Sequence, residues 1–351
     1  MTDLKQLRND IETEANRLGF SHLGIAPVQP VPHYDVYLNW VLDGKHAQMA
    51  YLAREDSLAK RGDPSLILEG CQRMICLALP YRPPETNMSE IPVGKGRISA
   101  YARTRDYHEI IWDKLSHLES FIQRQVQEPI LMKSYVDTGP VLERSYASAA
   151  GLGIAGKNTC LLIQGFGSYF FLAEILTDLA LPVDSPFTRD LCGTCQRCVD
   201  ACPTNCILPD HTIDANRCIS YLTIENKGRI PDDLKAQMDA WVFGCDVCQM
   251  VCPHNAWTPE TPIALGDPLL PEFIDLSKLI SENETLFKKS YGETPLSRAK
   301  WVGMLRNAAI ALGNQGIKAA IPALEQTLEK IPNPEVQDAC RWAIDQINQS
   351  G

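Results

Sequence analysis

Two cysteine-rich runs constrain this chain of 351 residues more than any other feature. The first run is CGTCQRCVDACP, in which Cys192, Cys195, Cys198 and Cys202 follow the spacing C-x2-C-x2-C-x3-C-P. In the bacterial pattern with this spacing, three cysteines bind one 4Fe-4S cluster and the fourth binds the other cluster of a pair. Each cluster takes four thiolates, so the chain must contain a second run.

The second run lies further along the chain and lacks only its first cysteine. Cys245, Cys248 and Cys252 precede Pro253 in the spacing C-x2-C-x3-C-P, and Cys218 can supply the missing ligand across an insertion. Structural zinc is the alternative, but it favours separated C-x2-C pairs without interlocked C-P ends. We therefore predict two 4Fe-4S clusters, one bound by Cys192, Cys195, Cys198 and Cys252, the other by Cys202, Cys218, Cys245 and Cys248.

The other cysteines and the composition fit a redox protein of the cytoplasm. Five cysteines remain, which we expect to be small buried hydrophobic residues: Cys71, Cys76, Cys160, Cys206 and Cys340. The N-terminal segment carries charges throughout, and no run of eighteen apolar residues occurs, so we expect neither a signal peptide nor a membrane span. In a reducing compartment, thirteen cysteines favour metal or redox chemistry over disulfides.

The rest of the chain predicts a multi-domain fold of mixed α+β and α/β class. Residues 1–185 alternate apolar runs with helical segments and read as one α/β domain. Residues 186–258 hold the two cysteine runs. In residues 259–351, LRNAAIALGNQG and VQDACRWAIDQI share an Ala-rich pattern that indicates helical repeats of HEAT type. The expected strands are Leu23–Ala26, Met74–Leu79, Met132–Val136, Cys160–Ile163 and Tyr169–Leu176.

Two polar motifs in the first half of the chain have more than one interpretation. DYHEII nearly matches a motif in which histidine binds cobalt, but Ile111 replaces the required glycine, so we expect His108 to be a helix-start residue. Asp137 ends KSYVD and precedes a Thr-Gly-Pro turn. It is either a turn-forming residue or a carboxyl group with a raised pKa at the edge of a sheet, and the residues alone leave both open.

A basic segment stands out in a chain whose net charge is −10. Between residues 288 and 306, five cationic residues accompany one acid, so the local charge is 5 − 1 = +4. The interleaved Tyr291 and Trp301 suit base stacking, and the cations suit phosphate contact. A solvated helix face is the alternative interpretation. The cations considered for RNA contact are Lys288, Lys289, Arg298 and Lys300.

An ordered set of motifs resembles the epoxyqueuosine reductase family, cobalamin-dependent iron–sulfur enzymes that complete queuosine in tRNA. The resemblance covers nearly the whole chain. Its motifs are RGDP (from Arg61), RDYHEI (from Arg105), VDTGPVLER (from Val136), AGLGIAGKNT (from Ala150), GSYFFLAEI (from Gly167), RCISYLTIE (from Arg217), the two cysteine runs and LRNAAIALG.

The resemblance implies a nitroreductase-like domain that holds cobalamin, as cob(II)alamin at rest, a ferredoxin-like domain beside it, and a HEAT-like tail that binds tRNA. Asp137 would be the catalytic acid and would also lie at the cobalamin. Ser99 stands where some relatives carry cysteine, so a thiol contact to cobalt is not expected there. The other residues implied near cobalamin are Arg61, Ser99, Lys157, Asn158, Ser168 and Ser220.

The implied reaction is reduction of the epoxide of epoxyqueuosine at the anticodon wobble position. It needs two electrons and two protons, and reduced ferredoxin or flavodoxin would supply the electrons through the clusters. We expect a monomer without membrane contact. The alternatives are a reductive dehalogenase, which typically carries an export signal, and a non-catalytic electron carrier, which needs neither a poised acid nor a basic surface.

Overall fold

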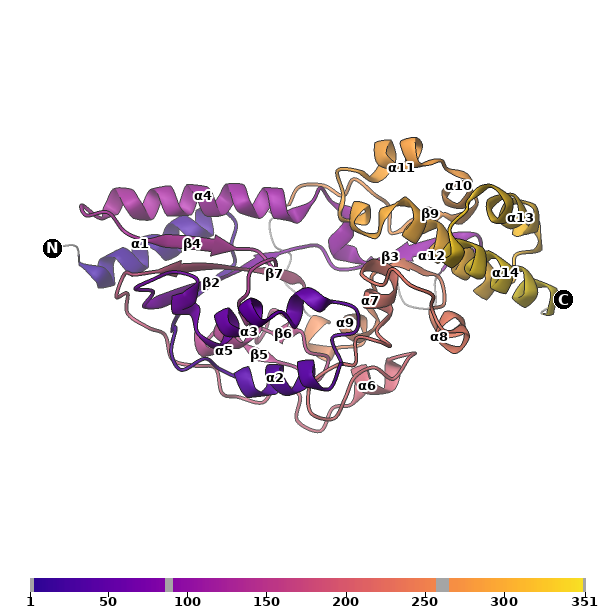
Figure 1. Ribbon diagram of the computed structural model, residues 1–351. Helices are drawn as coiled ribbons and strands as arrows, with labels where there is room; N and C mark the ends of the chain where they lie inside the picture. The colour runs from indigo at the N-terminus through magenta and orange to yellow at the C-terminus, as the bar shows by residue number, and fades with distance from the viewer. Residues whose placement is uncertain (1–2, 86–90, 257–264, 350–351) are drawn as a thin grey trace.

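The computed structural model describes residues 3–85, 91–256 and 265–349. The molecule is elongated, with the N-terminal helix at one end and the C-terminal helices at the other (Figure 1). Within the described ranges, no helix has the length and apolar character needed to cross a bilayer.

A four-stranded antiparallel sheet forms the centre of the N-terminal part. Its order is β1-β2-β7-β4, and each strand coincides with an apolar run predicted to be a strand. The fifth predicted strand is shorter than expected, because only β6 (Leu161–Leu162) forms there and pairs with β5 (Ile154–Ala155). The bounds of the central strands are β1 His22–Pro27, β2 Arg73–Pro80, β7 Phe170–Thr177 and β4 Met132–Tyr135.

Helices cover both faces of this sheet. Successive side chains of a strand point to opposite faces, and in β2 Ile75 and Leu77 belong to one apolar core while Met74 and Cys76 belong to another. The first core contains the apolar faces of α1 (Leu4–Arg17) and α4 (Tyr107–Gln125). The second contains α5 (Glu143–Ala149). The two remaining helices of this part are α2 (Tyr34–Leu42) and α3 (Glu55–Gly62).

A second sheet, of order β8-β3-β9, joins all three predicted domains. Strand β3 (Lys95–Ile98) comes from the N-terminal part, yet it pairs in parallel with β8 (Trp241–Phe243) and antiparallel with β9 (Phe273–Asp275). The predicted boundary at residue 185 therefore does not separate independent cores. Gly96 of β3 is tightly enclosed, since an added Cβ atom would lie 2.7 Å from side-chain atoms of β8 and of helix α10 (Leu276–Ser281). The boundary predicted after residue 258 lies outside the described residues.

Short helices surround the cysteines, and longer ones form the C-terminal end (Figure 1). Both Ala-rich segments are helical as predicted, in α12 and α14; their assignment to HEAT repeats stays a prediction. The bounds near the cysteines are α6 Arg197–Ala201, α7 Ile219–Ile224, α8 Asp232–Gln237 and α9 Val247–Met250. The C-terminal helices are α10 Leu276–Ser281, α11 Glu284–Tyr291, α12 Lys300–Asn314, α13 Ile321–Lys330 and α14 Pro334–Gln349.

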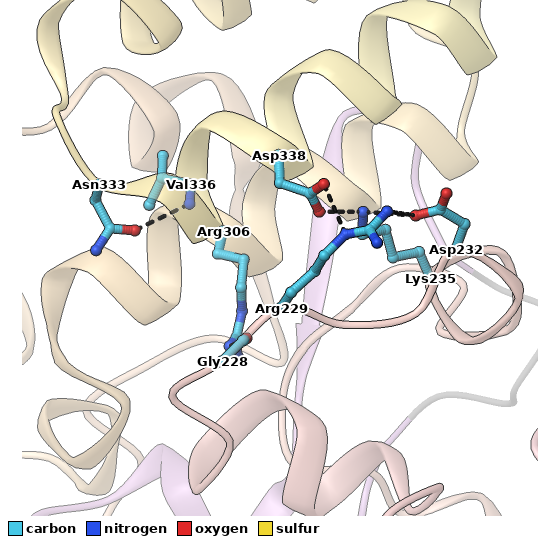
Figure 2. A network of polar contacts seen from close by, with 8 residues as sticks. All are labelled: Gly228, Arg229, Asp232, Lys235, Arg306, Asn333, Val336 and Asp338. Atoms are coloured by element: carbon cyan, nitrogen blue, oxygen red, sulfur yellow. Dashed lines mark hydrogen bonds and ion pairs between the residues drawn. The ribbon is translucent and has the colours of Figure 1, made fainter.

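A polar network fastens these last helices to the cysteine-rich part (Figure 2). Asp338 of α14 accepts hydrogen bonds from Lys235 Nζ at 2.5 Å and Arg229 Nε at 2.8 Å, and the Lys235 side chain is only 1% exposed. Arg306 of α12 is buried and donates to the backbone oxygens of Leu222 and Gly228. Arg306 is one of the five cations of the basic segment, but it binds backbone carbonyls in the interior and is not part of the basic surface.

Candidate functional site

The four cysteines assigned to the first cluster line one cavity. Its empty volume, which includes open solvent, is about 330 Å³, and Lys157 and His254 also line it. Helix α6 begins after Cys195, contains Cys198 and ends before Cys202, which does not line the cavity. The structure thus brings together thiols that are far apart in the sequence, in a number that suits one 4Fe-4S cluster. The four lining cysteines are Cys192, Cys195, Cys198 and Cys252.

The cysteines assigned to the second cluster also lie together. The Cys202 and Cys206 sulfur atoms are 3.5 Å apart, and Cys206 is also within hydrogen-bonding range of Cys218. Burial, with contributions from Cys218 and Cys202, raises the pKa of the Cys245 thiol well above its usual range. Cys245 therefore lies close to Cys202 and Cys218, and Cys248 follows Cys245 in the sequence, within α9. The division into two ligand sets stays a prediction that this arrangement supports.

The five remaining cysteines differ in their surroundings. Four are buried, as predicted: Cys71, Cys76, Cys206 and Cys340. Cys160 is half-buried and lies within hydrogen-bonding range of Cys248. The contacts of Cys160 and Cys206 with predicted ligands were missed, because neither residue belongs to a spacing motif.

Asp137 lies where β4 ends, in a chain of polar side chains. Its Oδ1 atom is 2.9 Å from His108 Nε2, its Oδ2 atom accepts from the Tyr107 hydroxyl, and His108 Nδ1 is 2.7 Å from Asp106 Oδ1. The Asp137 backbone has φ = 47°, a left-handed conformation that non-glycine residues rarely adopt. Such strain concentrates at functional sites. Since both nitrogens of His108 are engaged, the helix-start interpretation fits better than cobalt ligation.

His108 is a cation at neutral pH in this setting. Burial opposes its charge, but hydrogen bonds and charges from Asp106 and Asp137 outweigh burial and raise the pKa of His108 to about 9. The Tyr107 ring stacks on Phe171 with centroids 4.0 Å apart, which fixes its hydroxyl toward Asp137. The Asp137 side chain is 40% exposed. The described residues therefore leave part of this carboxyl group open to solvent.

Two glutamates lie near the Asp137 loop, Glu174 fully buried and Glu143 half-buried. Glu174 is fully buried in β7, and its two carboxyl oxygens have no hydrogen-bond partner among the described residues. Burial, together with the charge of Asp137, raises the pKa of Glu143 to about 8, and burial raises the pKa of Glu174 well above its usual range. Burial therefore favours the protonated form of both carboxyl groups. In the sequence, the buried position of Glu174 could have been recognised from one feature, an acidic residue within the apolar run FFLAEI.

Arg61 alone among the residues implied at cobalamin contacts the Asp137 loop. Its Nη2 atom donates to the Gly139 carbonyl at 3.4 Å, and its guanidinium lies over the Tyr37 ring. The residue is buried, and Nη1 has no partner among the described residues. An unpaired buried donor is costly, so Nη1 is suited to an acceptor outside the chain.

The other implied cofactor residues brace the contact between the sheet domain and the cysteine-rich part. Lys157 Nζ donates to the carbonyls of Gly193 and Cys195, both at 2.9 Å. Asn158 donates to the Cys248 carbonyl, and Ser168 to the Gln249 side chain.

Ser99 and Ser220 differ in how far they are covered. Ser99 is 1% exposed and covered by Gly244, where an added Cβ atom would lie 2.0 Å from its hydroxyl oxygen. Ser220 is half-buried in α7.

The basic segment borders the Asp137 site. The amide of Asp106, which caps α4, donates to the Glu293 carbonyl in the loop after α11. Arg298 Nε lies 2.6 Å from Glu225 Oε1, and the Arg298 charge acts on both Asp137 and Tyr107. The remaining three cations of the segment are exposed, and they are Lys288, Lys289 and Lys300.

Comparisons with known proteins agree over the whole chain. A family model described as "Epoxyqueuosine reductase QueG, DUF1730" matches residues 61–138, and one described as "4Fe-4S double cluster binding domain" matches residues 191–255. The curated epoxyqueuosine reductase of Cyclobacterium marinum is 41% identical over 88% of this chain and 97% of its own length. That of Pseudomonas aeruginosa is 38% identical over 97% of this chain and 95% of its own length.

Solved structures show the same fold. A selenomethionine-labelled epoxyqueuosine reductase aligns with a TM-score of 0.88 and 30% identity, covering 98% of this chain and 91% of the other. A complex of such a reductase with an epoxyqueuosine-modified tRNA stem loop aligns with 0.87 and 29%, at the same coverage. A Bacillus subtilis enzyme, described with its catalytic aspartate loop swung out of the active site, aligns with 0.86 and 29%, again at that coverage.

Proposed function

Because this chain belongs to the epoxyqueuosine reductase family, we propose that it reduces the epoxide of epoxyqueuosine in tRNA to the alkene of queuosine. The observation that carries the proposal is the neighbourhood of Asp137. A cationic histidine lies against Asp137, the basic segment contacts Asp106 through Glu293, and the same chain carries two sets of cysteines. The reaction needs an acid, an electron path and an RNA-binding surface, and these features can provide all three.

The proposal includes cobalamin, which would supply a strongly reducing, nucleophilic metal centre when bound. The fit of the residues rests on Arg61, whose buried Nη1 atom can donate to a carbonyl of a corrin side chain. We propose Arg61, Ser99, Asp137, Lys157, Asn158, Ser168 and Ser220 as the residues that hold it. The deep burial of Ser99 limits that residue to a supporting role through its neighbours.

Asp137 is the proposed acid. Opening an epoxide leaves an alkoxide, a poor leaving group, so a carboxyl group must deliver a proton to that oxygen. His108 and Tyr107 hold the carboxyl group in place. Reduction to the alkene consumes two electrons and two protons in total and releases the oxygen as water. The catalytic aspartate loop described for the Bacillus subtilis relative supports this role.

The proposed reaction also requires two partners, an electron donor and a tRNA substrate. The two clusters would pass electrons one at a time from reduced ferredoxin or flavodoxin. The substrate would be tRNA with epoxyqueuosine at the wobble position, bound with the help of Lys288, Lys289, Arg298 and Lys300. The tRNA stem loop bound by a structural relative supports this substrate. We propose a monomer that works in the cytoplasm, where its substrate resides.

Mass spectrometry of tRNA nucleosides tests the function. A strain without this protein should accumulate epoxyqueuosine and lose queuosine, and the wild-type chain should restore queuosine while Asp137→Asn should not. Unchanged queuosine in the deletion strain would refute the proposal. The purified, reconstituted protein should convert epoxyqueuosine tRNA directly, which neither a dehalogenase nor an electron carrier would do.

A further inference from the structure

Cys206 occupies an unusual place for a residue outside the ligand motifs. It is 4% exposed, and its sulfur lies 3.5 Å from that of Cys202. The same thiol is within hydrogen-bonding range of Cys218, and its backbone N–H lies 3.4 Å from the Cys202 sulfur. Cys202 and Cys218 are adjacent in space although they belong to different turns of the chain. Cys206 is the group that fills the space between them.

We propose that Cys206 is not a cluster ligand but a hydrogen-bond donor to the Cys202 or the Cys218 sulfur, and that it makes the reduction potential of their cluster more positive. This inference rests on the predicted ligand set of the second cluster. A thiol has one hydrogen to donate, and ligating thiolates are acceptors. Reduction adds negative charge to a cluster, and hydrogen bonds to its sulfurs stabilise that charge.

The surroundings of the first predicted cluster differ. Besides its four cysteines, its cavity is lined by Lys157, Arg197 and His254, and no further cysteine belongs to that lining. The Lys157 ammonium group donates to loop carbonyls and not to sulfur. Removing the Cys206 thiol should therefore change one cluster and leave the other unchanged. This selectivity separates a hydrogen-bond effect from a general loss of folding.

The test is a redox titration of the full chain, purified and reconstituted without oxygen, with electron paramagnetic resonance as the readout. Cys206→Ala removes the donor, Cys206→Ser keeps an O–H donor, and Cys71→Ala is a control, since Cys71 is buried in another core. All three variants should retain about eight irons. Cys206→Ala should make reduction of one cluster about tenfold less favourable, a negative shift of about 59 mV for a one-electron couple.

Cys206→Ser should stay closer to the wild type than Cys206→Ala does, and the other cluster should keep its potential in every variant. Loss of about four irons in Cys206→Ala would mean that Cys206 is itself a ligand, which overturns the inference. Two unmoved potentials in Cys206→Ala would overturn it as well. Fewer than about eight irons in the wild type would instead refute the ligand assignment on which the inference rests.

Discussion

The Nε2 atom of His108 lies 2.9 Å from Oδ1 of Asp137, so a cation directly faces the proposed acid. Asp106 holds the opposite ring nitrogen, and the Tyr107 hydroxyl reaches the second oxygen of Asp137. The three residues Asp106, Tyr107 and His108 are consecutive at the start of α4. The rigid first turn of one helix thus orients a side chain that the strained loop after β4 presents.

The first prediction concerns pH. The pKa of His108 is raised to about 9, so its proton is present at neutral pH and is lost as pH rises through that value. We expect the single-turnover rate to fall near pH 9, because a neutral imidazole loses the charge-assisted hydrogen bond that holds the Asp137 side chain in place. His108→Gln should lower the rate and abolish that limb. Rates measured with pre-reduced enzyme from about pH 6 to about pH 10 check this.

The free energy of unfolding provides an independent readout for the contact between His108 and Asp137. A group whose pKa is raised by folding stabilises the fold fully below its unfolded value, which is about 6.5 for histidine. This contribution disappears as pH rises through about 9. The stability difference between wild type and His108→Gln should therefore be constant in acid and shrink over that window. A difference that grows with pH would contradict the pairing.

The second prediction tests the interlocked cysteines. Cys252→Ser should remove the cluster held with Cys192, Cys195 and Cys198, and iron should fall from about eight to about four per chain. Cys71→Ser is the matched control, because Cys71 lies in a separate apolar core. Iron and sulfide analysis of anaerobically purified protein gives the answer. Full iron content in Cys252→Ser would separate Cys252 from that cluster.

Local sequence patterns predicted the parts of this fold that local chemistry determines. Four central strands follow apolar runs, and cysteine spacing identified the thiols that line one cavity. Strand β3 (KGRI) was missed because a glycine and two cations give it no alternating pattern. Its strand pairing comes from partners that follow it in the chain by more than a hundred residues.

In the site too, local sequence patterns identified individual residues but not their contacts with distant parts of the chain. Asp137 could be named from its motif, but its contact with His108 joins the end of a strand to the start of a helix, which periodicity does not encode. Arg298 and Arg306 look alike in the sequence, yet Arg298 pairs with Glu225 near the site, whereas Arg306 lies on the buried face of α12. Glu174 lies opposite Cys76 on the face of the sheet that α5 covers, so its burial depends on elements distant in the sequence.

The third prediction concerns tRNA. Replacing Lys288, Lys289 and Lys300 with glutamine should weaken binding and lower the salt dependence of log K by about 0.7–0.9 for each lost phosphate contact. These side chains are exposed, so clusters and fold should be unaffected. The control replaces Lys5, Arg124 and Lys133, equally exposed cations on α1, α4 and β4. Equal salt slopes for the two triple variants would move the RNA surface elsewhere.

Arg298 should behave differently from those lysines. It pairs with Glu225 and acts on Asp137 and Tyr107, so Arg298→Gln should slow turnover even when tRNA saturates the enzyme. An effect on affinity alone would place Arg298 with the three lysines.

The fourth prediction addresses the C-terminal anchor. Asp338→Asn removes the charge that faces Lys235, which is almost fully buried, and among the described residues it leaves the more exposed Asp232 as the anionic partner (Figure 2). An under-compensated buried cation should cost about 1–3 kcal/mol. The midpoint of thermal unfolding should fall accordingly. Asp232→Asn should cost less, because Asp232 is 56% exposed. The reverse order would contradict the network.

The last prediction is that Asp137→Asn abolishes most turnover without disturbing binding. The amide is nearly isosteric with the carboxyl group and can still face the Tyr107 hydroxyl, but it cannot deliver a proton to the epoxide oxygen. The single-turnover rate should fall by on the order of a hundredfold or more, the usual scale for loss of a general acid. Iron content, cobalamin absorbance and tRNA affinity should match the wild type.

Glu143→Gln is the informative companion, because Glu143 lies against the same loop but is not proposed to reach the substrate. It should slow the reaction less than Asp137→Asn does. An Asp137→Asn enzyme that turns over within a few-fold of wild type would transfer the acid role to another residue, with Tyr107 the next to test.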